Sequence, residues 1–385
     1  MSKKTIAIMA TSPIAVKFHL ENIIEHINEK YIVIVVTNLS EDSHRYLKNF
    51  SKEVRFFDSK MKRKISIIHD IRTLILLFRF FRNEKISMFF SITPKAGLLG
   101  SLASFFMRVP IRVHTFTGQV WQTKKGFYKR LLMFLDRLIY LLCTKVLVDS
   151  PSQRQFLIEN RIISFKDSLV LGNGSFCGVD INRFLPNRDS RTNIRKMMRV
   201  SDTDIIFLFV GRFDIDKGII ELIKAFSLLL DEIKNISLWL LGPSENANKY
   251  LDELITIKES EKIKILPYSQ SPEKYMAAAD IFCLPSYREG FGTVIIESAA
   301  SGIPSIGTNI HGLIDSIVDG KTGLLVDPGD IKSLSESMFK LASNQELRIK
   351  MGRAARSRAK ELYSQDLVVP RLGHFIDNEL QNLDI

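Results

Sequence analysis

Short apolar runs alternate with longer amphipathic stretches along the whole chain. Each run is rich in Val, Ile, Leu and Phe, the pattern of strands buried on both faces of a parallel sheet. The first predicted series is Thr5–Met9, Ile32–Thr37, Met88–Ile92, Arg112–Thr115 and Lys145–Val148. The second is Ile205–Val210, Leu238–Leu241, Ile263–Leu266, Ile281–Leu284, Ser305–Gly307 and Gly323–Val326. Helical stretches between these strands predict the α/β class with doubly wound sheets.

A polar, basic segment, residues 177–200, separates the two series. We therefore expect one domain over residues 1–184 and a second over 185–365. The last helical stretch, 366–385, has no strand after it, and we expect it to cross back to the first domain. Two Rossmann-like domains of this kind bind ligands at the carboxyl ends of their strands, so the pattern predicts a cleft between them.

The composition is that of a globular protein, with 385 residues, 45% hydrophobic and 25% charged. It excludes collagen, disulfide scaffolds and long disordered tails. Cys143, Cys177 and Cys283 lack metal-ligand spacing, so we expect no zinc site and a reducing compartment. No run offers the ~20 clean apolar residues of a spanning helix. The sequence thus predicts a cytoplasmic protein that touches a membrane without crossing it.

The charge is uneven along the chain. Residues 1–180 hold 28 Lys and Arg against 14 Asp and Glu, a net +14, and residues 181–385 hold 26 against 28, a net −2, which together give the +12 of the chain. Two interpretations stay open for the basic half: it faces an anionic partner or a membrane surface, or it is an ordinary solvated basic face.

The sharpest basic signal lies at residues 60–82. One face of the helix predicted there carries Ser66, His69, Arg72, Thr73, Arg79 and Arg82, and the segment opens with Lys60, Lys62, Arg63 and Lys64. Such a helix lies in a membrane interface, or packs on a sheet with its basic stripe in water. A second basic and aromatic patch spans residues 124–130. No nucleic-acid recognition pattern is present, so we expect no nucleic-acid partner.

The densest candidate chemistry lies in residues 284–304, LPSYREGFGTVIIESAASGIP. A strand ends at Leu284, a loop with Gly290 and Gly292 follows, and a helix is predicted from Thr293 to Ala300. Glycines let backbone N–H groups approach a ligand, and a helix N-terminus favours phosphate or sugar oxygens. Glu289 and Glu297 lie where carboxylates would accept hydrogen bonds from two polyol rings joined by phosphates. Capping or salt-bridge roles for either Glu are the alternative.

A second motif, VGRFDIDKG, spans residues 210–218 and follows a predicted strand. Arg212 lies at the carboxyl end of that strand, and Lys217 lies at the start of the next helix. Two cations there would neutralise a diphosphate leaving group. The alternative is a solvent-exposed turn in which both pair with Asp214 and Asp216.

The first half offers weaker candidates at the ends of two strands. His114 would donate to a sugar hydroxyl, although a lone His is more often structural. An acceptor pocket would be lined by Thr117, Gly118 and Gln119 from one loop, and by Thr93 and Lys95 from another. The alternative is that these loops only connect a strand to the next helix.

Together these motifs resemble the retaining glycosyltransferases of family 4, which have the glycosyltransferase-B fold. The matching parts are Gly178–Phe184, Gly211–Gly218, Ala278–Pro304 and Asp319–Val326. The second half matches strongly, and the first half matches only by layout. The resemblance implies that the second domain binds a nucleotide-sugar, taken as a UDP-sugar, and that the first binds the acceptor.

The resemblance also implies residue roles. It assigns Arg212 and Lys217 to the diphosphate, Glu289 to the hydroxyls of the donor sugar and Glu297 to the ribose. His114 would lie near the donor sugar. Further donor contacts are expected, mostly from backbone, at Gly211, Tyr268, Gly290, Phe291, Gly292 and Thr293. Two departures from the family pattern stand out: the loop 10–13 after the first strand lacks glycine, and Asp315 stands where the family often has Glu.

The function expected from sequence is therefore transfer of a sugar, with retention, to a lipid-linked glycan at the inner face of the bacterial cell membrane, in surface polysaccharide synthesis. Asp214 and Asp216 lie on the loop that approaches the helix, beside Lys217, so they do not form a DxD-like metal motif at the expected cleft. We therefore expect metal-independent activity and no cofactor. The alternatives are a nucleotide-sugar epimerase and a non-catalytic subunit that binds sugar nucleotides.

Overall fold

The structure is a computed structural model that describes residues 3–39, 43–48, 50–243 and 261–383, with only the backbone described at 44 and 45. It divides into two compact units. Unit 1 comprises Met1–Cys177 and Gln365–Ile385, and unit 2 comprises Gly178–Ser364. The division thus falls between Cys177 and Gly178, before the boundary expected at 184, and the C-terminal helix belongs to unit 1. The last residues of that expected helix, 384 and 385, lie outside the described part.

Unit 1 contains a seven-stranded parallel sheet in the order β3-β2-β1-β4-β5-β6-β7. Its strands are β1 (Thr5–Met9), β2 (Ile32–Thr37), β3 (Arg55–Asp58), β4 (Ile86–Ser91), β5 (Ile111–Phe116), β6 (Lys145–Val148) and β7 (Ser168–Leu169). Its helices are α1 (Pro13–His19), α2 (Glu21–Asn28), α3 (Ser43–Leu47), α4 (Ile67–Asn83), α5 (Pro94–Phe106), η1 (Val120–Thr123), α6 (Gly126–Leu142), α7 (Pro151–Glu159) and α17 (Gln365–Gln381).

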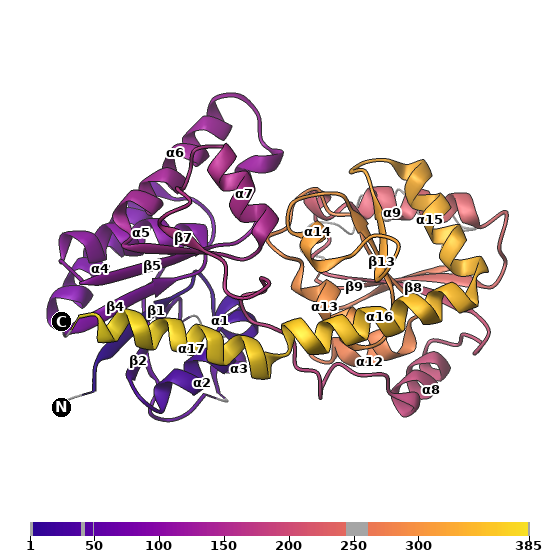
Figure 1. The fold of residues 1–385 in the computed structure, drawn as a ribbon, viewed down its shortest axis with the longest axis horizontal. Coiled ribbons are helices and arrows are strands. Elements are labelled where there is room, and N and C mark those ends of the chain that lie inside the picture. Colours follow the sequence, from indigo (N-terminus) through magenta and orange to yellow (C-terminus); the bar gives the residue numbers. More distant parts are fainter. Residues whose placement is uncertain (1–2, 40–42, 49, 244–260, 384–385) are drawn as a thin grey trace. The chain divides into compact units, whose positions relative to one another are not determined.

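Helices cover both faces of this sheet, with α4, α5 and α6 on one side and α1, α2 and α17 on the other (Figure 1). Strand β1 buries side chains on both faces of the sheet. Ile6 and Ile8 pack in the cluster that contains α2 and α17, whereas Ala7 and Met9 pack in the cluster of α4 and α5. Because successive side chains point to opposite faces, a strand covered on both sides reads as a continuous apolar run.

Unit 2 contains a six-stranded parallel sheet in the order β10-β9-β8-β11-β12-β13. Its strands are β8 (Ile205–Val210), β9 (Ile236–Leu241), β10 (Ile263–Leu266), β11 (Ile281–Leu284), β12 (Ser305–Thr308) and β13 (Gly323–Val326). Its helices are α8 (Arg188–Met197), η2 (Ile215–Lys217), α9 (Ile219–Leu229), α12 (Pro272–Ala278), α13 (Thr293–Ala300), α14 (Leu313–Ser316), α15 (Ile331–Ser343) and α16 (Gln345–Tyr363).

Both units are thus doubly wound α/β sheets, which confirms the predicted fold class. Every strand expected from sequence is present within two residues at each end. Two strands were missed, β3 and β7. Strand β3 is short and none of its residues is fully buried, so it lacks the apolar run, and β7 has only two residues.

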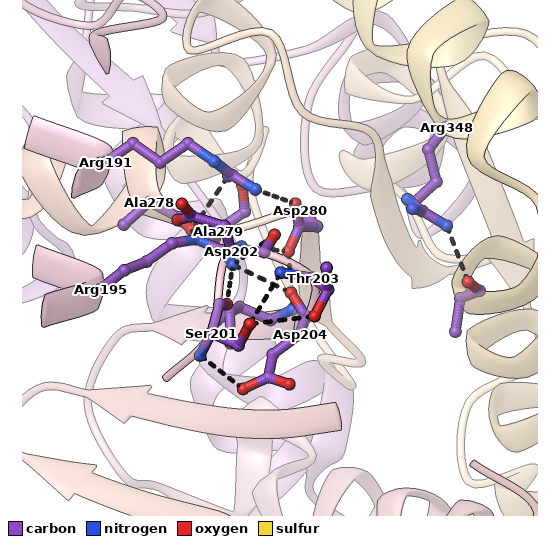
Figure 2. Close-up of polar contacts among 12 residues, drawn as sticks. Arg191, Arg195, Ser201, Asp202, Thr203, Asp204, Ala278, Ala279, Asp280 and Arg348 are labelled. Atoms are coloured by element: carbon purple, nitrogen blue, oxygen red, sulfur yellow. Dashed lines mark hydrogen bonds and ion pairs between the residues drawn. The ribbon is translucent and has the colours of Figure 1, made fainter. Parts of the chain in front are cut away.

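A charged cluster anchors α8 to the sheet of unit 2 (Figure 2). The Asp280 carboxylate accepts from Arg191 Nη2 at 2.8 Å and from Arg195 Nη2 at 2.6 Å. The Arg195 side chain is only 1% exposed, and it also donates to the carbonyl oxygens of Ala278, Ser201 and Asp204. A buried guanidinium is tolerated when its donors are satisfied, and the contacts of Arg195 meet that condition.

Candidate functional site

The site in unit 2 forms where the order of its strands reverses. Strands β8 and β11 are neighbours at the centre of the sheet, and the chain winds outward from them in opposite directions. In doubly wound sheets, ligands bind outside the carboxyl ends of the strands at this point. The loop after β8 carries Arg212 and Lys217, and the loop after β11 carries Glu289, so the fold brings the two predicted motifs to the same edge.

Lys217 and Glu289 form an ion pair across these two loops. Lys217 Nζ lies 2.5 Å from Glu289 Oε1, and both side chains are largely buried. The hydroxyl of Ser286 donates to the same carboxylate at 2.8 Å. The salt bridge that the sequence left open for Glu289 is therefore present, and its partner is the cation that the second motif predicted.

Arg212 has a different environment. Its guanidinium is 46% exposed and lies 3.3 Å from the carboxylate of Asp214. The alternative interpretation of this motif, a turn in which the cations pair with Asp214 and Asp216, thus holds for Arg212 but not for Lys217. Asp216 instead accepts from Arg288 Nε at 2.8 Å, which ties the η2 loop to the loop of Glu289 a second time.

Two glycines allow the loops of this site to pack closely. Gly218 has φ +68°, and a Cβ there would lie 1.9 Å from the carbonyl oxygen of Pro285. Gly312 has φ +90°, and its Cβ would lie 2.6 Å from the carbonyl oxygen of Gly290. A side chain at either position would both strain the backbone and push the loops apart. Sequence reasoning missed Gly312, because nothing in the local pattern shows which loop it contacts.

The start of α13 lies beside the Lys217–Glu289 pair. Gly290, Gly292 and Thr293 lead into this helix, and Gly292, with φ +75°, is its N-cap residue. Phe291 is fully buried, and its ring packs edge-on against Tyr363 with centroids 5.0 Å apart. The side chain of Phe291 is therefore part of the core of unit 2.

Glu297 lies one turn into α13 and is partly buried. Burial raises the pKa of its carboxyl to about 7, Arg183 opposes that shift, and Glu273 adds to it. The remaining donor candidates lie on the same sheet edge. Gly211 follows β8, and Tyr268 follows β10 with an exposed ring.

Stability of unit 2 should depend on the pH through Glu297. Because the pKa of Glu297 is raised in the folded state, the folded protein binds the carboxyl proton more tightly than the unfolded chain does. The free energy of unfolding of unit 2 should therefore fall as the pH rises from about 4.5 to about 7. We expect Glu297→Gln to melt at a higher temperature than wild type at pH 8, with a difference that shrinks towards pH 5. The exposed Glu232→Gln variant is the control. A difference that does not change with pH would contradict this expectation.

The candidates in unit 1 also lie on the carboxyl edge of their sheet. Strand order reverses between β1 and β4, and there the hydroxyl oxygens of Thr11 and Thr93 lie 2.6 Å apart. Thr93 Oγ1 also accepts from the backbone N–H of Thr11, at 3.0 Å. The glycine-free loop after β1 is thus fixed to the loop after β4 by side-chain hydrogen bonds.

His114 is buried on β5, with only 1% of its surface exposed. Its Nδ1 lies 2.8 Å from the Ser91 hydroxyl, and its ring packs against Phe116. Burial lowers the pKa of the imidazole to about 3, so the ring is neutral at physiological pH. A neutral imidazole donates through one nitrogen and accepts through the other, which suits hydrogen bonding to a hydroxyl better than charge neutralisation.

The loop after β5 rests on a buried polar network. Gln119 Oε1 accepts from Gln153 Nε2 at 2.6 Å, and Trp121 Nε1 donates to Asp136 Oδ2 at 2.7 Å. Burial raises the pKa of Asp136 to about 6, and the hydrogen bonds from Trp121 and Gln119 oppose the shift. Gln119 thus has internal partners, whereas Thr117 and Gly118 are half-buried at the start of the loop.

Lys95 has internal partners too. Its ammonium lies 2.6 Å from Asp70 Oδ1 and donates to the carbonyl oxygens of Lys62 and Lys64. Lys95, which the sequence analysis placed in the lining of an acceptor pocket, thus binds the segment before α4 instead.

Within the described residues, no group of three or more His, Cys, Asp or Glu side chains is arranged to hold a metal ion. None of the described helices is both long enough and apolar enough to cross a membrane.

The fold thus defines a class of protein with two doubly wound α/β units. In unit 2 a cation–carboxylate pair lies at the sheet edge where folds of this class bind ligands. Residues 190–358 match the family model described as "Glycosyl transferases group 1". Capsular polysaccharide biosynthesis glycosyltransferase CapM of Staphylococcus aureus is 30% identical over 325 residues, which cover 82% of this chain and 85% of that protein.

A second relative and a solved structure are also similar to this chain, the structure in its fold. UDP-Gal:alpha-D-GlcNAc-diphosphoundecaprenol alpha-1,3-galactosyltransferase of Escherichia coli is 24% identical over 84% of this chain and 83% of its own length. The structure of Anabaena Alr3699/HepE in complex with UDP and glucose superposes with a TM-score of 0.81 at 17% identity, covering 97% of this chain and all of that one. This chain belongs to the group 1 glycosyl transferases. The predicted resemblance to a glycosyltransferase is confirmed, and nothing in these comparisons supports an epimerase.

Proposed function

We propose that this glycosyltransferase transfers a sugar from a UDP-sugar to a hydroxyl of a lipid-linked glycan, with retention and without a metal ion, in the synthesis of a surface polysaccharide. The observation that carries the proposal is the Lys217–Glu289 pair where strand order reverses, beside the N-terminus of α13. The names of the relatives support the product class and the lipid-linked acceptor, and the complex of HepE with UDP and glucose supports the donor.

In the proposed reaction unit 2 holds the donor. Lys217 and Arg212 neutralise the diphosphate as the bond to the sugar breaks, and the backbone N–H groups at the start of α13 add positive potential. Glu289 accepts from hydroxyls of the sugar, and Glu297 accepts from the ribose. Gly211, Tyr268 and the backbone of Gly290–Thr293 complete the donor contacts.

Unit 1 holds the acceptor in this proposal. Thr93, Thr117 and Gly118 line the acceptor pocket, while Lys95 and Gln119 fix the segments that shape it. His114, as a neutral imidazole, hydrogen bonds to the donor sugar. The acceptor hydroxyl attacks from the face that the diphosphate leaves, so the leaving oxygen takes up the proton. We propose that the positive charge of unit 1 attracts the enzyme to the inner face of the cell membrane, where a lipid-linked acceptor would reside.

The test is a transfer assay in EDTA with a panel of UDP-, dTDP- and GDP-sugars and a short-chain polyprenyl diphosphate sugar as acceptor. We expect UDP release that depends on the acceptor, and a product that keeps the anomeric configuration of the donor by NMR. Conversion of the donor without acceptor would identify an epimerase, and donor binding without turnover would identify a non-catalytic subunit. An inverted product would refute retention, and activity lost in EDTA would refute metal independence.

A further inference from the structure

An outward row of isoleucines lies at the start of α4. Ile67 and Ile68 are 74% and 66% exposed, and Ile71 and Ile75 continue the row one and two turns on. The opposite side of the helix buries Thr73, Leu77 and Phe80. The sequence pattern placed Thr73 on the polar face, and the structure corrects this: the outer face is isoleucine at its N-terminal half and carries Arg79 and Arg82 further on. Single exposed apolar side chains are common, but a contiguous row indicates a surface that is covered in use.

The N-terminal half of α6 repeats this feature. Phe127 is 81% exposed and Phe134 is 62% exposed, with Tyr128 and Leu131 between them. Residues 127, 131 and 134 are spaced four and three apart, so they share one side of the helix. Basic side chains accompany them, as in α4: Lys124, Lys125, Lys129 and Arg130.

The topology places these two apolar rows at the same end of one helical layer. Helices α4, α5 and α6 are successive neighbours on one face of the sheet of unit 1 (Figure 1). Each follows one parallel strand and precedes another, so all three begin at the carboxyl edge of the sheet. Helix α5 lies between the other two and is mostly buried. The rows on α4 and α6 thus flank α5 on the outer side of unit 1.

An internal clamp fixes the basic residues beside the isoleucines. The Lys95 ammonium pairs with Asp70 and donates to the carbonyl oxygens of Lys62 and Lys64, at 2.7 and 2.8 Å, so it binds the segment before α4 to the start of α5. Asp70 is the only acidic residue between 60 and 82. Since Lys95 pairs with Asp70, the other charged side chains between residues 60 and 82 are all positive, including those of Lys62, Arg63, Lys64 and Arg72.

We propose that this surface, the docking face formed by residues 62–75 and 124–134, binds an anionic lipid bilayer, with the isoleucine and phenylalanine side chains entering the acyl region and the Lys and Arg side chains contacting headgroup phosphates. An apolar row within a basic rim complements a bilayer of this kind, because the rim matches the negative headgroups and the row matches the interior. The inference rests on the proposed function, since it presents unit 1 to a lipid-linked acceptor.

The test is co-sedimentation of the full chain with vesicles at low salt. We expect binding to vesicles containing 30% phosphatidylglycerol, little binding to pure phosphatidylcholine, and loss of binding at high salt. The variant Ile68→Ser/Ile71→Ser should lower the partition coefficient at least about tenfold. The variant Lys62→Gln/Lys64→Gln should weaken binding and flatten its salt dependence. The matched control is Leu228→Ser/Ile349→Ser, which alters exposed apolar side chains of unit 2 and should bind as wild type does.

Several results would overturn the docking face. Wild type that stays in the supernatant at low salt, equal binding to both lipid compositions, or unchanged binding by the isoleucine variant would each do so. If instead an acidic protein, and not the vesicles, recovers wild type but not the isoleucine variant, the face belongs to a protein partner. Transfer to a water-soluble acceptor tests the proposed function separately, and the isoleucine variant should retain this activity. If wild type fails to transfer sugar to such an acceptor, the proposed function is refuted, whereas the vesicle-binding result still stands.

Discussion

Replacing Lys217 by methionine is expected to lower kcat/KM for sugar transfer by about 10²–10³-fold, the usual effect of losing one electrostatic contact to a developing negative charge. Lys217 is the largely buried cation of the site and lies 2.5 Å from Glu289, whereas Arg212 is half exposed. A cation shielded from water acts more strongly on the diphosphate. Because the charge of the leaving group grows in the transition state, kcat should fall more than the donor affinity.

The matched control for this variant is Lys224→Met, which removes an exposed lysine from the adjoining helix α9 and should leave kcat/KM unchanged. Losing Lys217 also leaves the Glu289 carboxylate with Ser286 as its remaining partner, so melting curves are needed to show that unit 2 stays folded. A folded Lys217→Met enzyme within threefold of wild type would remove Lys217 from the proposed mechanism.

Removing the Asp280 carboxylate is expected to destabilise unit 2 by about 3–5 kcal/mol, because a buried ion pair that loses one partner leaves an uncompensated charge. Asp280 is the acidic partner of the almost fully buried Arg195 (Figure 2). Its Oδ2 also accepts from the backbone N–H of Ile206 at 2.8 Å. Asp280→Ala therefore removes the anionic partner of the Arg195 guanidinium and the acceptor of the Ile206 N–H.

Hydrogen exchange resolves this effect, because a chain of two units need not unfold in one step. Peptides from β8 and β11 should lose protection in Asp280→Ala, while peptides from β1 should not. Asp202→Ala, at an exposed residue of the loop between α8 and β8, should behave as wild type does. The double variant Arg195→Met/Asp280→Ala should recover part of the loss, since it removes the stranded charge. Equal protection in the double and single variants would contradict the charge argument.

The architecture could be predicted from sequence because it follows from local patterns. Strands such as Ile205–Val210 and Ile281–Leu284 are covered on both faces, and each is a short run of apolar side chains for that reason. Helix Thr293–Ala300 was predicted with the bounds that it has, since glycine precedes it and a strand ends shortly before. The strands that were missed, β3 and β7, are short and lack an apolar run.

The partners of the site residues could not be predicted in the same way. Lys217 and Glu289 are far apart in sequence, and their pairing depends on β8 and β11 being neighbours, which is a property of strand order. The same holds for Lys95, which sequence placed near an acceptor and which instead binds Asp70 and the segment before α4. Such pairs leave no periodic signal, because each partner alone looks like any charged loop residue.

The sequence by itself determined the two doubly wound sheets, the order of the glycosyltransferase motifs and the uneven charge. Buried strands and amphipathic helices each produce a local pattern of apolar and polar residues, which can be recognised without the tertiary structure. Only the tertiary structure decided which loops meet, that Lys217 contacts Glu289, and that the outer face of α4 carries exposed isoleucines as well as arginines while Thr73 is buried. These facts depend on how strands and helices pack side by side, and packing joins residues that the chain keeps far apart.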